Sequence, residues 1–349
     1  MKSKKGLYLV LFLTLFMSCS DDDDPKPDLA WISEQEQVVK TFWPKSGGLV
    51  YYFLESGILK SVDTKTKEIR EVTDIPFDAA YYGLWINSQG TIAYFITQGC
   101  QTELSSFGSG CFNKVDLKTG EITTLLDGIT LFPIAEFNDR YLAIVKGFIP
   151  GSTGIFLISL ESGESKQLQT VSIPLSFSTD GAYLAMFERG GAREIYNTLT
   201  GEAEVLTTNN LSFYESKFTG RSGLAARSPL SNWSSIEVTR ILSKQHIGSI
   251  SVTAKPVLTA EGAFSFYLYG DYRISSSGIR LAYVTFTCNS NASNCKQYDF
   301  VLKVRNLETQ GDVEVHQAAF TDDLFGMTFS PNEDEIIYIV GNNIYRSVL

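Results

Sequence analysis

The sequence predicts an all-β fold, specifically a seven-bladed β-propeller of four-stranded antiparallel blades. Val, Ile, Thr, Tyr and Phe alternate with polar residues along most of the chain. No long stretch keeps the apolar period of a helix, about 3.6 residues. A turn followed by an apolar strand recurs seven times, at intervals of 40 to 57 residues. Propeller blades occupy about 40 to 50 residues, so each copy fits one blade, with insertions in two of them.

Residues 1–18 have the features of an export signal. Three lysines precede the eleven-residue apolar segment 7–17, and a small serine follows it. A membrane-spanning helix needs roughly 20 apolar residues, so this segment is too short to be one. Cys19 comes directly after, and this order resembles the lipobox of bacterial lipoproteins, with Phe16 where such boxes usually carry Leu. The resemblance implies that Cys19 is acylated; an ordinary secretory peptide is the alternative.

Residues 19–28 are expected to form a tether. Four adjacent aspartates repel one another, and two prolines keep the segment extended. An acidic run directly after the acylated cysteine resembles the surface-export signal of Bacteroidota lipoproteins. That resemblance implies a protein on the outer membrane, exposed at the cell surface and in contact with the membrane through its N-terminal lipid only. A solvated spacer on a protein that faces the periplasm is the alternative.

Two repeated turns organise the rest of the chain. The first is clearest in FSTDGAYLAMF (177–187) and ISSSGIRLAYV (274–284). The second follows about 20 residues after the first, as in VDLKTGE (115–121) and YNTLTGE (196–202). This pair of turns resembles the TolB-type, or WD-like, β-propeller family over residues 35–349. The resemblance implies the fold and leaves the function open.

The last blade has three predicted strands, at 325–330, 335–340 and 343–349. An open ring would leave unpaired strand edges. We therefore expect its fourth strand to come from the N-terminal side, within 29–39, so that the propeller spans 29–349.

The two faces of such a ring differ. Both repeated turns lie on one face, which we name the turn face. The connections between second and third strands, and those between blades, lie on the opposite face, named the loop face. The long segments 98–113, 254–274 and 287–297 all belong to the loop face. We expect this face to be held in shape for contact with a partner.

Four cysteines remain besides Cys19. In an exported protein they can oxidise, and their short spacings favour pairing Cys100 with Cys111 and Cys288 with Cys295, although three connectivities are possible. Closing a ring of about 10 residues lowers the entropy of the unfolded state by roughly 2 to 3 kcal/mol. A metal site is the weaker alternative, because the chain has no CxxC motif and only two histidines.

Candidate ligand-binding residues are the large or charged side chains of the predicted loop-face loops. Aromatic rings stack on sugars and on peptide side chains, whereas most aromatic residues of this chain should fill the core. The candidates are Tyr81, Tyr82, Phe132, Arg189, Arg193, Phe213, Tyr214, Trp233, Tyr269, Asp271, Asp322 and Asp323.

Catalytic chemistry finds little support. No G-x-S-x-G motif occurs, and His246 and His316 are predicted to lie on opposite faces. No calcium-binding loop of D-x-D-x-D-G type is present, so we expect no catalytic residue, metal or cofactor. The formal charge of -10, which becomes -13 without residues 1–18, disfavours nucleic acid as a partner.

The leading hypothesis is a lipid-anchored, non-catalytic envelope propeller that binds a protein or a glycan through its loop face. One alternative is a propeller-type glycan hydrolase or lyase that uses loop carboxylates. The other is a structural subunit of an envelope assembly, as the TolB resemblance implies.

Overall fold

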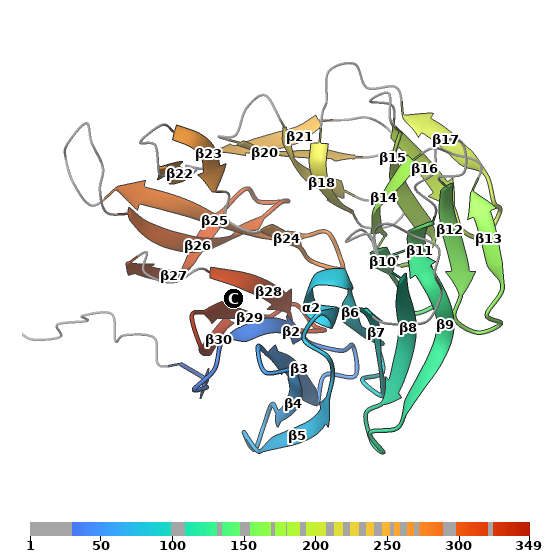
Figure 1. Ribbon diagram of the computed structural model, residues 1–349. Coiled ribbons are helices and arrows are strands. Elements are labelled where there is room, and N and C mark those ends of the chain that lie inside the picture. The colour runs from blue at the N-terminus through green and yellow to red at the C-terminus, as the bar shows by residue number, and fades with distance from the viewer. Residues whose placement is uncertain are drawn as a thin grey trace, which may run out of the picture.

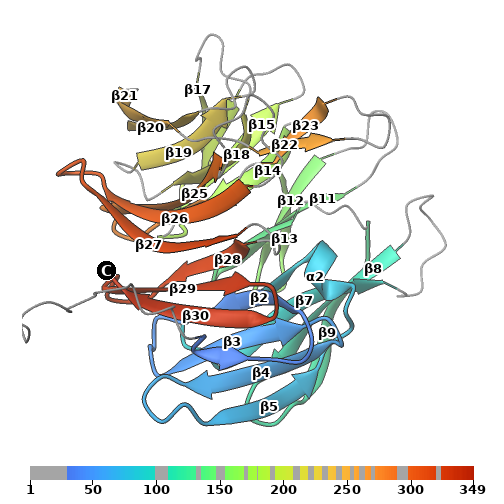
Figure 2. The same cartoon turned by 90° about the vertical axis from the view of Figure 1, so that its left-hand side faces the viewer.

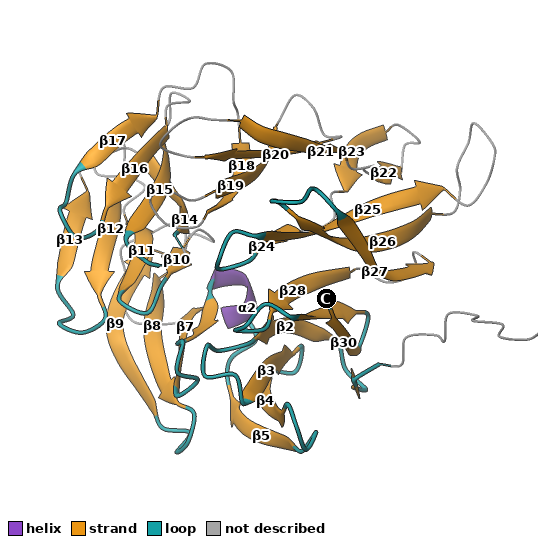
Figure 3. Ribbon diagram, turned by 180° about the vertical axis from the view of Figure 1, so that it is seen from behind, coloured by secondary structure: helices purple, strands orange, loops and turns teal. Residues whose placement is uncertain are grey.

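Short antiparallel strands joined by tight turns form almost all of the described structure, in agreement with the all-β prediction (Figure 3). Within the described residues the one helix is the single turn α2 (Ala79–Tyr82). The computed structural model describes residues 30–98, 109–130, 135–146, 154–168, 172–178, 180–188, 193–206, 213–218, 224–229, 235–240, 246–251, 255–258, 264–268, 272–288, 298–319 and 324–349.

The described strands form seven four-stranded antiparallel sheets. In the first six, four strands that follow one another along the chain pair in order. The first three sheets consist of β2 (Val38–Phe42), β3 (Leu49–Leu54), β4 (Ile58–Asp63) and β5 (Ile69–Asp74); β6 (Leu84–Ile86), β7 (Ile92–Gln98), β8 (Ser109–Asp116) and β9 (Ile122–Thr130); and β10 (Ala135–Phe137), β11 (Tyr141–Lys146), β12 (Gly154–Ser159) and β13 (Ser165–Leu168).

The next three sheets follow the same pattern, with a two-stranded hairpin inserted before the sixth. They consist of β14 (Ser172–Phe177), β15 (Tyr183–Glu188), β16 (Arg193–Asn197) and β17 (Ala203–Leu206); β18 (Phe213–Phe218), β19 (Leu224–Pro229), β20 (Ser235–Arg240) and β21 (His246–Ser251); the hairpin β22 (Lys255–Leu258) and β23 (Phe264–Leu268); and β24 (Tyr272–Ile274), β25 (Arg280–Cys288), β26 (Tyr298–Asn306) and β27 (Asp312–Ala319).

The seventh sheet joins the two ends of the described chain. Its strands β28 (Leu324–Phe329), β29 (Glu335–Val340) and β30 (Asn343–Val348) are followed at the outer edge by β1 (Ile32–Ser33). Ile32 pairs with Ile344 and Ser33 with Asn343, and the Trp31 N–H donates to the Ile344 carbonyl at 2.8 Å. A fourth strand therefore comes from the N-terminal side, within the segment that the sequence predicted.

The sheets lie around a common centre, with the first strand of each sheet innermost (Figure 1). Apolar side chains fill the space between neighbouring sheets, as Tyr51 and Phe53 of the first sheet and Phe95 of the second illustrate. The last sheet packs on the first in the same way, where Tyr52 meets Ile337 and Ile339. Burying such a side chain fully is worth about 1.5 to 3 kcal/mol, so these inter-sheet layers supply most of the stability.

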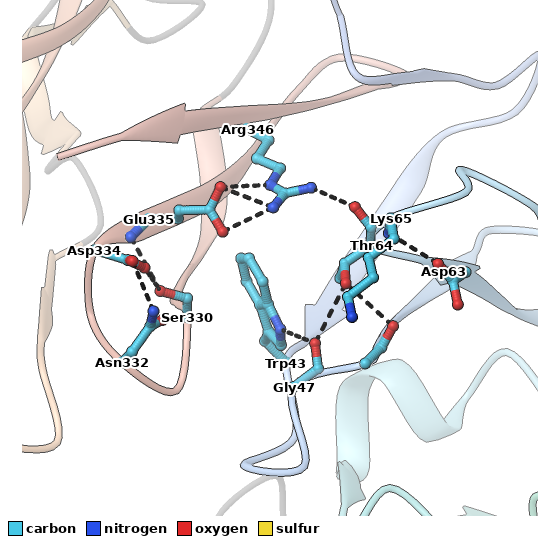
Figure 4. A network of polar contacts seen from close by, with 11 residues as sticks. Trp43, Gly47, Asp63, Thr64, Lys65, Ser330, Asn332, Asp334, Glu335 and Arg346 are labelled. Carbon is cyan, nitrogen blue, oxygen red and sulfur yellow. Dashed lines mark hydrogen bonds and ion pairs between the residues drawn. The ribbon is translucent and has the colours of Figure 1, made fainter.

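Arg346 fastens the last sheet to the first from within β30. Its guanidinium forms a bidentate pair with the Glu335 carboxylate at 2.8 to 2.9 Å and donates to the Thr64 carbonyl at 2.8 Å (Figure 4). The guanidinium also lies over the rings of Trp31 and Trp43, 5.3 and 5.6 Å from their centroids. One side chain thus contacts the residue before β1, the start of β29, and the residues that follow β2 and β4 of the first sheet.

The turn that follows the first strand of a sheet also contacts the corresponding turn of the neighbouring sheet. The Ser46 N–H donates to the Ser88 carbonyl at 3.2 Å, and the Ser88 N–H donates to Asp139 Oδ1 at 2.9 Å. Between the sixth and seventh sheets, Ser276 and Ser277 donate to the Glu333 carboxylate. These contacts place neighbouring turns side by side on the turn face.

The junction at Arg346 predicts a large effect of Arg346→Met. This change leaves the largely buried Glu335 carboxylate without its charge partner, so we expect the free energy of unfolding to fall by about 2 to 3 kcal/mol, measured by urea denaturation. The control is Arg70→Met, because Arg70 and Glu68 form a pair that is 71% and 56% exposed. That control should change stability by less than about 0.5 kcal/mol. Equal losses in the two variants would contradict the role given to Arg346.

The surroundings of Glu333 predict that the free energy of unfolding depends on pH. Burial alone would raise the pKa of this carboxyl, but hydrogen bonds from Ser277 and Ser276 outweigh it and hold the pKa below the ordinary value of 4.5. Because the folded pKa lies below the unfolded one, ionised Glu333 stabilises the fold above the unfolded pKa, and that contribution is lost as the pH falls through the folded pKa.

Between about pH 5 and pH 3, the free energy of unfolding of Glu333→Gln should therefore fall less steeply than that of the unaltered protein. Urea denaturation at several pH values measures both slopes. Glu121→Gln, at an exposed turn glutamate, is the matched control. Parallel pH profiles for Glu333→Gln and the unaltered protein would show that this carboxylate is not stabilised by folding.

Candidate functional site

The helix α2 lies near the centre of the ring of sheets, in the connection between the first and second sheets (Figure 1). Viewed from the side, α2 and the C-terminal end of β30 lie on opposite sides of the molecule (Figure 2). Asp78 precedes the helix, and its Oδ2 accepts the Gln98 N–H at 2.6 Å. Its Oδ1 is shielded from solvent and has no hydrogen-bond partner. The Asp78 carboxylate thus ties α2 to the end of β7 through one oxygen, while its other oxygen is buried without a hydrogen bond.

Gly83 ends α2 beneath the ring of Trp85. The glycine has φ +147°, and a Cβ added there would lie 1.9 Å from the indole. The Gly83 carbonyl accepts the Ile96 N–H at 3.0 Å, which ties the end of α2 to β7. Only glycine allows this close approach, so Gly83 sets the position of Trp85.

Trp85 belongs to a set of side chains on the first strands of three neighbouring sheets, which we name the inner aromatic row: Lys40, Phe42, Trp85 and Phe137. Trp85 stacks on Phe137 with ring centroids 5.4 Å apart. The Lys40 ammonium lies 5.8 Å from the Phe42 centroid and 5.9 Å from that of Trp85. All four side chains are half-buried. The rings pack against the core clusters of neighbouring sheets, and the Lys40 ammonium lies near two of them.

Sequence reasoning missed the inner aromatic row. In each of three successive repeats, an aromatic residue stands one or two positions before the first repeated turn. These residues are Phe42, Trp85 and Phe137. That recurrence was the available signal. It went unused because the candidates were drawn only from predicted loops.

The structure corrects the expected location of three candidates and describes two more. Tyr81 and Tyr82 lie in the connection between the first and second sheets, as predicted, and form part of the helical turn α2; their side chains are not described. Phe213 and Tyr214 lie within β18, and Arg193 is the first residue of β16. Strand pairing extends further than the turn residues indicated, and it takes these three out of the loops. The other candidates lie outside the described residues: Phe132, Arg189, Trp233, Tyr269, Asp271, Asp322 and Asp323.

The cysteines are placed in part. Cys111 is buried, forms a disulfide bond, and lies in β8 rather than in a loop, opposite Thr97. Its predicted partner Cys100 lies outside the described residues, so that pairing stays a prediction. Cys288 ends β25, and its predicted partner Cys295 also lies outside them. The lipidation candidate Cys19 is outside them too.

The titratable groups of the described residues are mostly engaged in structural contacts. Glu34 accepts from Tyr52 Oη at 2.6 Å and from Lys60 Nζ at 3.0 Å. Burial and then the Glu34 carboxylate raise the pKa of Tyr52 far above its ordinary value. His316 is buried beside the rings of Phe300 and Tyr338. Among the described residues no three His, Cys, Asp or Glu side chains gather as a metal site would require.

Comparison with known proteins identifies the architecture. No protein family matches the sequence, and no curated protein does. A chain in the crystal structure of a mitotic checkpoint complex, a WD40 β-propeller, superposes with a TM-score of 0.56 at 10% identity. The match covers 93% of this chain and 94% of that one. The fold is that of a β-propeller.

The likeness to known structures concerns architecture alone. Matching folds occur in 1287 chains of known structure, so the propeller by itself does not select a function. No helix in the described part of the chain is long and apolar enough to cross a membrane. Any functional assignment therefore depends on local features of this propeller, such as α2 and the inner aromatic row.

Gly83→Ala tests the arrangement around α2. The added methyl group must displace the Trp85 ring, so we expect a loss of stability of more than about 1 kcal/mol and a changed near-ultraviolet circular dichroism spectrum. Gly163→Ala is the control for a methyl group added at a positive φ, +71°, with open space at the Cβ position; because Gly83 has φ +147°, the changed spectrum is the readout that reports the contact with Trp85. An effect of Gly83→Ala no larger than that of the control, with an unchanged spectrum, would contradict the packing described.

Proposed function

We propose that the chain is a closed seven-bladed propeller that acts as a non-catalytic binding module of the cell envelope. Support for closure comes from the seven four-stranded sheets, from the pairing of β1 with β30, and from the packing of the last sheet on the first. A rigid ring of this kind holds loops from distant parts of the sequence on one face, as a binding surface requires.

The proposed module is attached to the outer membrane through an acylated Cys19 and exposed at the cell surface. The export signal and the cysteine that follows it support the anchor, and the acidic run that comes next supports the surface location. This part of the proposal relies on resemblance to lipoproteins of Bacteroidota and to TolB-type propellers. A periplasmic orientation is the alternative outcome.

The partner is a protein or a glycan that contacts the centre of the loop face. The observation that carries this proposal is the position of α2, with Tyr81 and Tyr82 in its sequence, near the centre of the ring and beside the inner aromatic row. Tyrosine and tryptophan bring large apolar area at low entropic cost and dominate many binding surfaces. The similar chain belongs to a multi-protein complex, which supports a protein partner in general.

Tyr81→Ala combined with Tyr82→Ala tests the proposal. Envelope extracts and a glycan array are probed with the soluble form that begins at Asp28, and the retained component is then titrated. Losing two aromatic contacts should weaken its binding by about tenfold or more. Leu199→Ala on the turn face is the control and should bind as the unaltered protein does. Undiminished binding by the double variant would rule out α2 as the contact.

A further inference from the structure

The exposed large apolar side chains of the described residues all lie on the turn face. Val348 is 78% exposed, Leu199 66% and Val313 53%. Six members lie in a repeated turn or next to one, and Val348 lies at the end of β30 on the same face. The set is Leu49, Ile69, Ile122, Leu199, Ile279, Val313 and Val348.

Five sheets contribute to this apolar set: the first, second, fourth, sixth and seventh. The hydrogen bonds from Ser46 to Ser88 and from Ser88 to Asp139 join turns of neighbouring sheets. The contact of Ser276 with Glu333 does the same between the sixth and seventh sheets. The apolar side chains therefore belong to one surface, where they stand singly among polar turn residues.

The described chain enters the seventh sheet from the direction of this surface. β1 runs antiparallel to β30, and the Trp31 ring lies over the Arg346 guanidinium, two residues before Val348. β1 therefore runs in the direction from the turn face to the loop face, and its two residues pair with Ile344 and Asn343 near the loop-face end of β30. Residues 1–29 precede it in the sequence.

We propose that the turn face rests on the lipid surface to which the N-terminal anchor attaches, with its apolar side chains in the headgroup region. This proposal depends on the acylation of Cys19 proposed above. Ten residues separate Cys19 from Ala30, and a chain of that length reaches at most about 35 Å. A tether so short keeps the ring beside the bilayer at a high effective concentration. The side on which the chain enters and the location of the apolar set select the turn face.

Because the protein is negatively charged, contact between the turn face and the lipid needs the covalent anchor. The chain acylated at Cys19 lacks residues 1–18 and has a formal charge of -13, so it is not attracted to anionic headgroups. Seven separate apolar side chains bury too little area to hold the ring at a bilayer unaided, whereas acyl chains add about 0.8 kcal/mol per buried methylene. Contact through the turn face leaves α2 and the loop face directed away from the lipid.

Two tryptophan substitutions at opposite ends of β30 test the orientation. Val348 ends the strand on the turn face, whereas Asn342 lies in the turn before it, on the loop face, and is also exposed. The lipidated full chain carrying Val348→Trp or Asn342→Trp is reconstituted in phosphatidylethanolamine and phosphatidylglycerol vesicles, with or without brominated acyl chains. The fluorescence of the unaltered protein is subtracted as background. Leu199→Trp is a second turn-face variant in case Val348→Trp folds poorly.

We expect brominated lipid to reduce the added emission of Val348→Trp and Leu199→Trp at least twofold and to leave that of Asn342→Trp unchanged. Equal quenching at both ends of β30, quenching only at Asn342→Trp, or quenching at neither end would overturn the orientation. The mass of the N-terminal peptide shows separately whether Cys19 is acylated. Failure of the anchor, failure of the orientation and failure of partner binding at α2 are thus distinguished.

Discussion

The hydrogen bonds between β1 and β30 join the two ends of the described chain, and the apolar layer between the last and first sheets is buried at that junction. Each sheet has two apolar faces, which stay buried only while a sheet lies on either side. The first and last sheets would each expose one face unless they packed together, as Tyr52 and Ile337 do. Arg346 strengthens the junction because it contacts Trp31 just before β1, Glu335 of β29 and Thr64 directly after β4.

The connections on the two faces of the ring differ in length and in their hydrogen bonds. On the turn face, Asp63 and Asp116 each accept two backbone N–H groups from residues two and three positions later. Hydrogen bonds of this kind, from Thr66 and Lys65 in the case of Asp63, hold the pKa of the carboxyl below its usual range. The loop face carries the longer connections. The repeats therefore resemble one another most in the turns of the turn face and differ most in the connections of the loop face.

Sequence reasoning predicted what local chemistry determines. The repeated turns were recognisable because their hydrogen bonds join residues only a few positions apart, and counting strands located the closing strand within 29–39. The inner aromatic row and α2 were missed because Lys40, Trp85 and Phe137 meet only through the packing of separate sheets. Cys111 was expected in a loop because its pairing with Thr97 depends on how far two strands continue.

The position of β1 has a consequence for biosynthesis. Ile32 and Ile344 lie near opposite ends of the described residues, yet the two pair directly. Closing so long a segment is slow because its entropy must be lost before the contact forms. A chain that lacks β28, β29 and β30 has no partner for β1. The apolar face of the first sheet that packs on the seventh sheet is then exposed. The pairing of β1 can therefore form only after β30 has been synthesised.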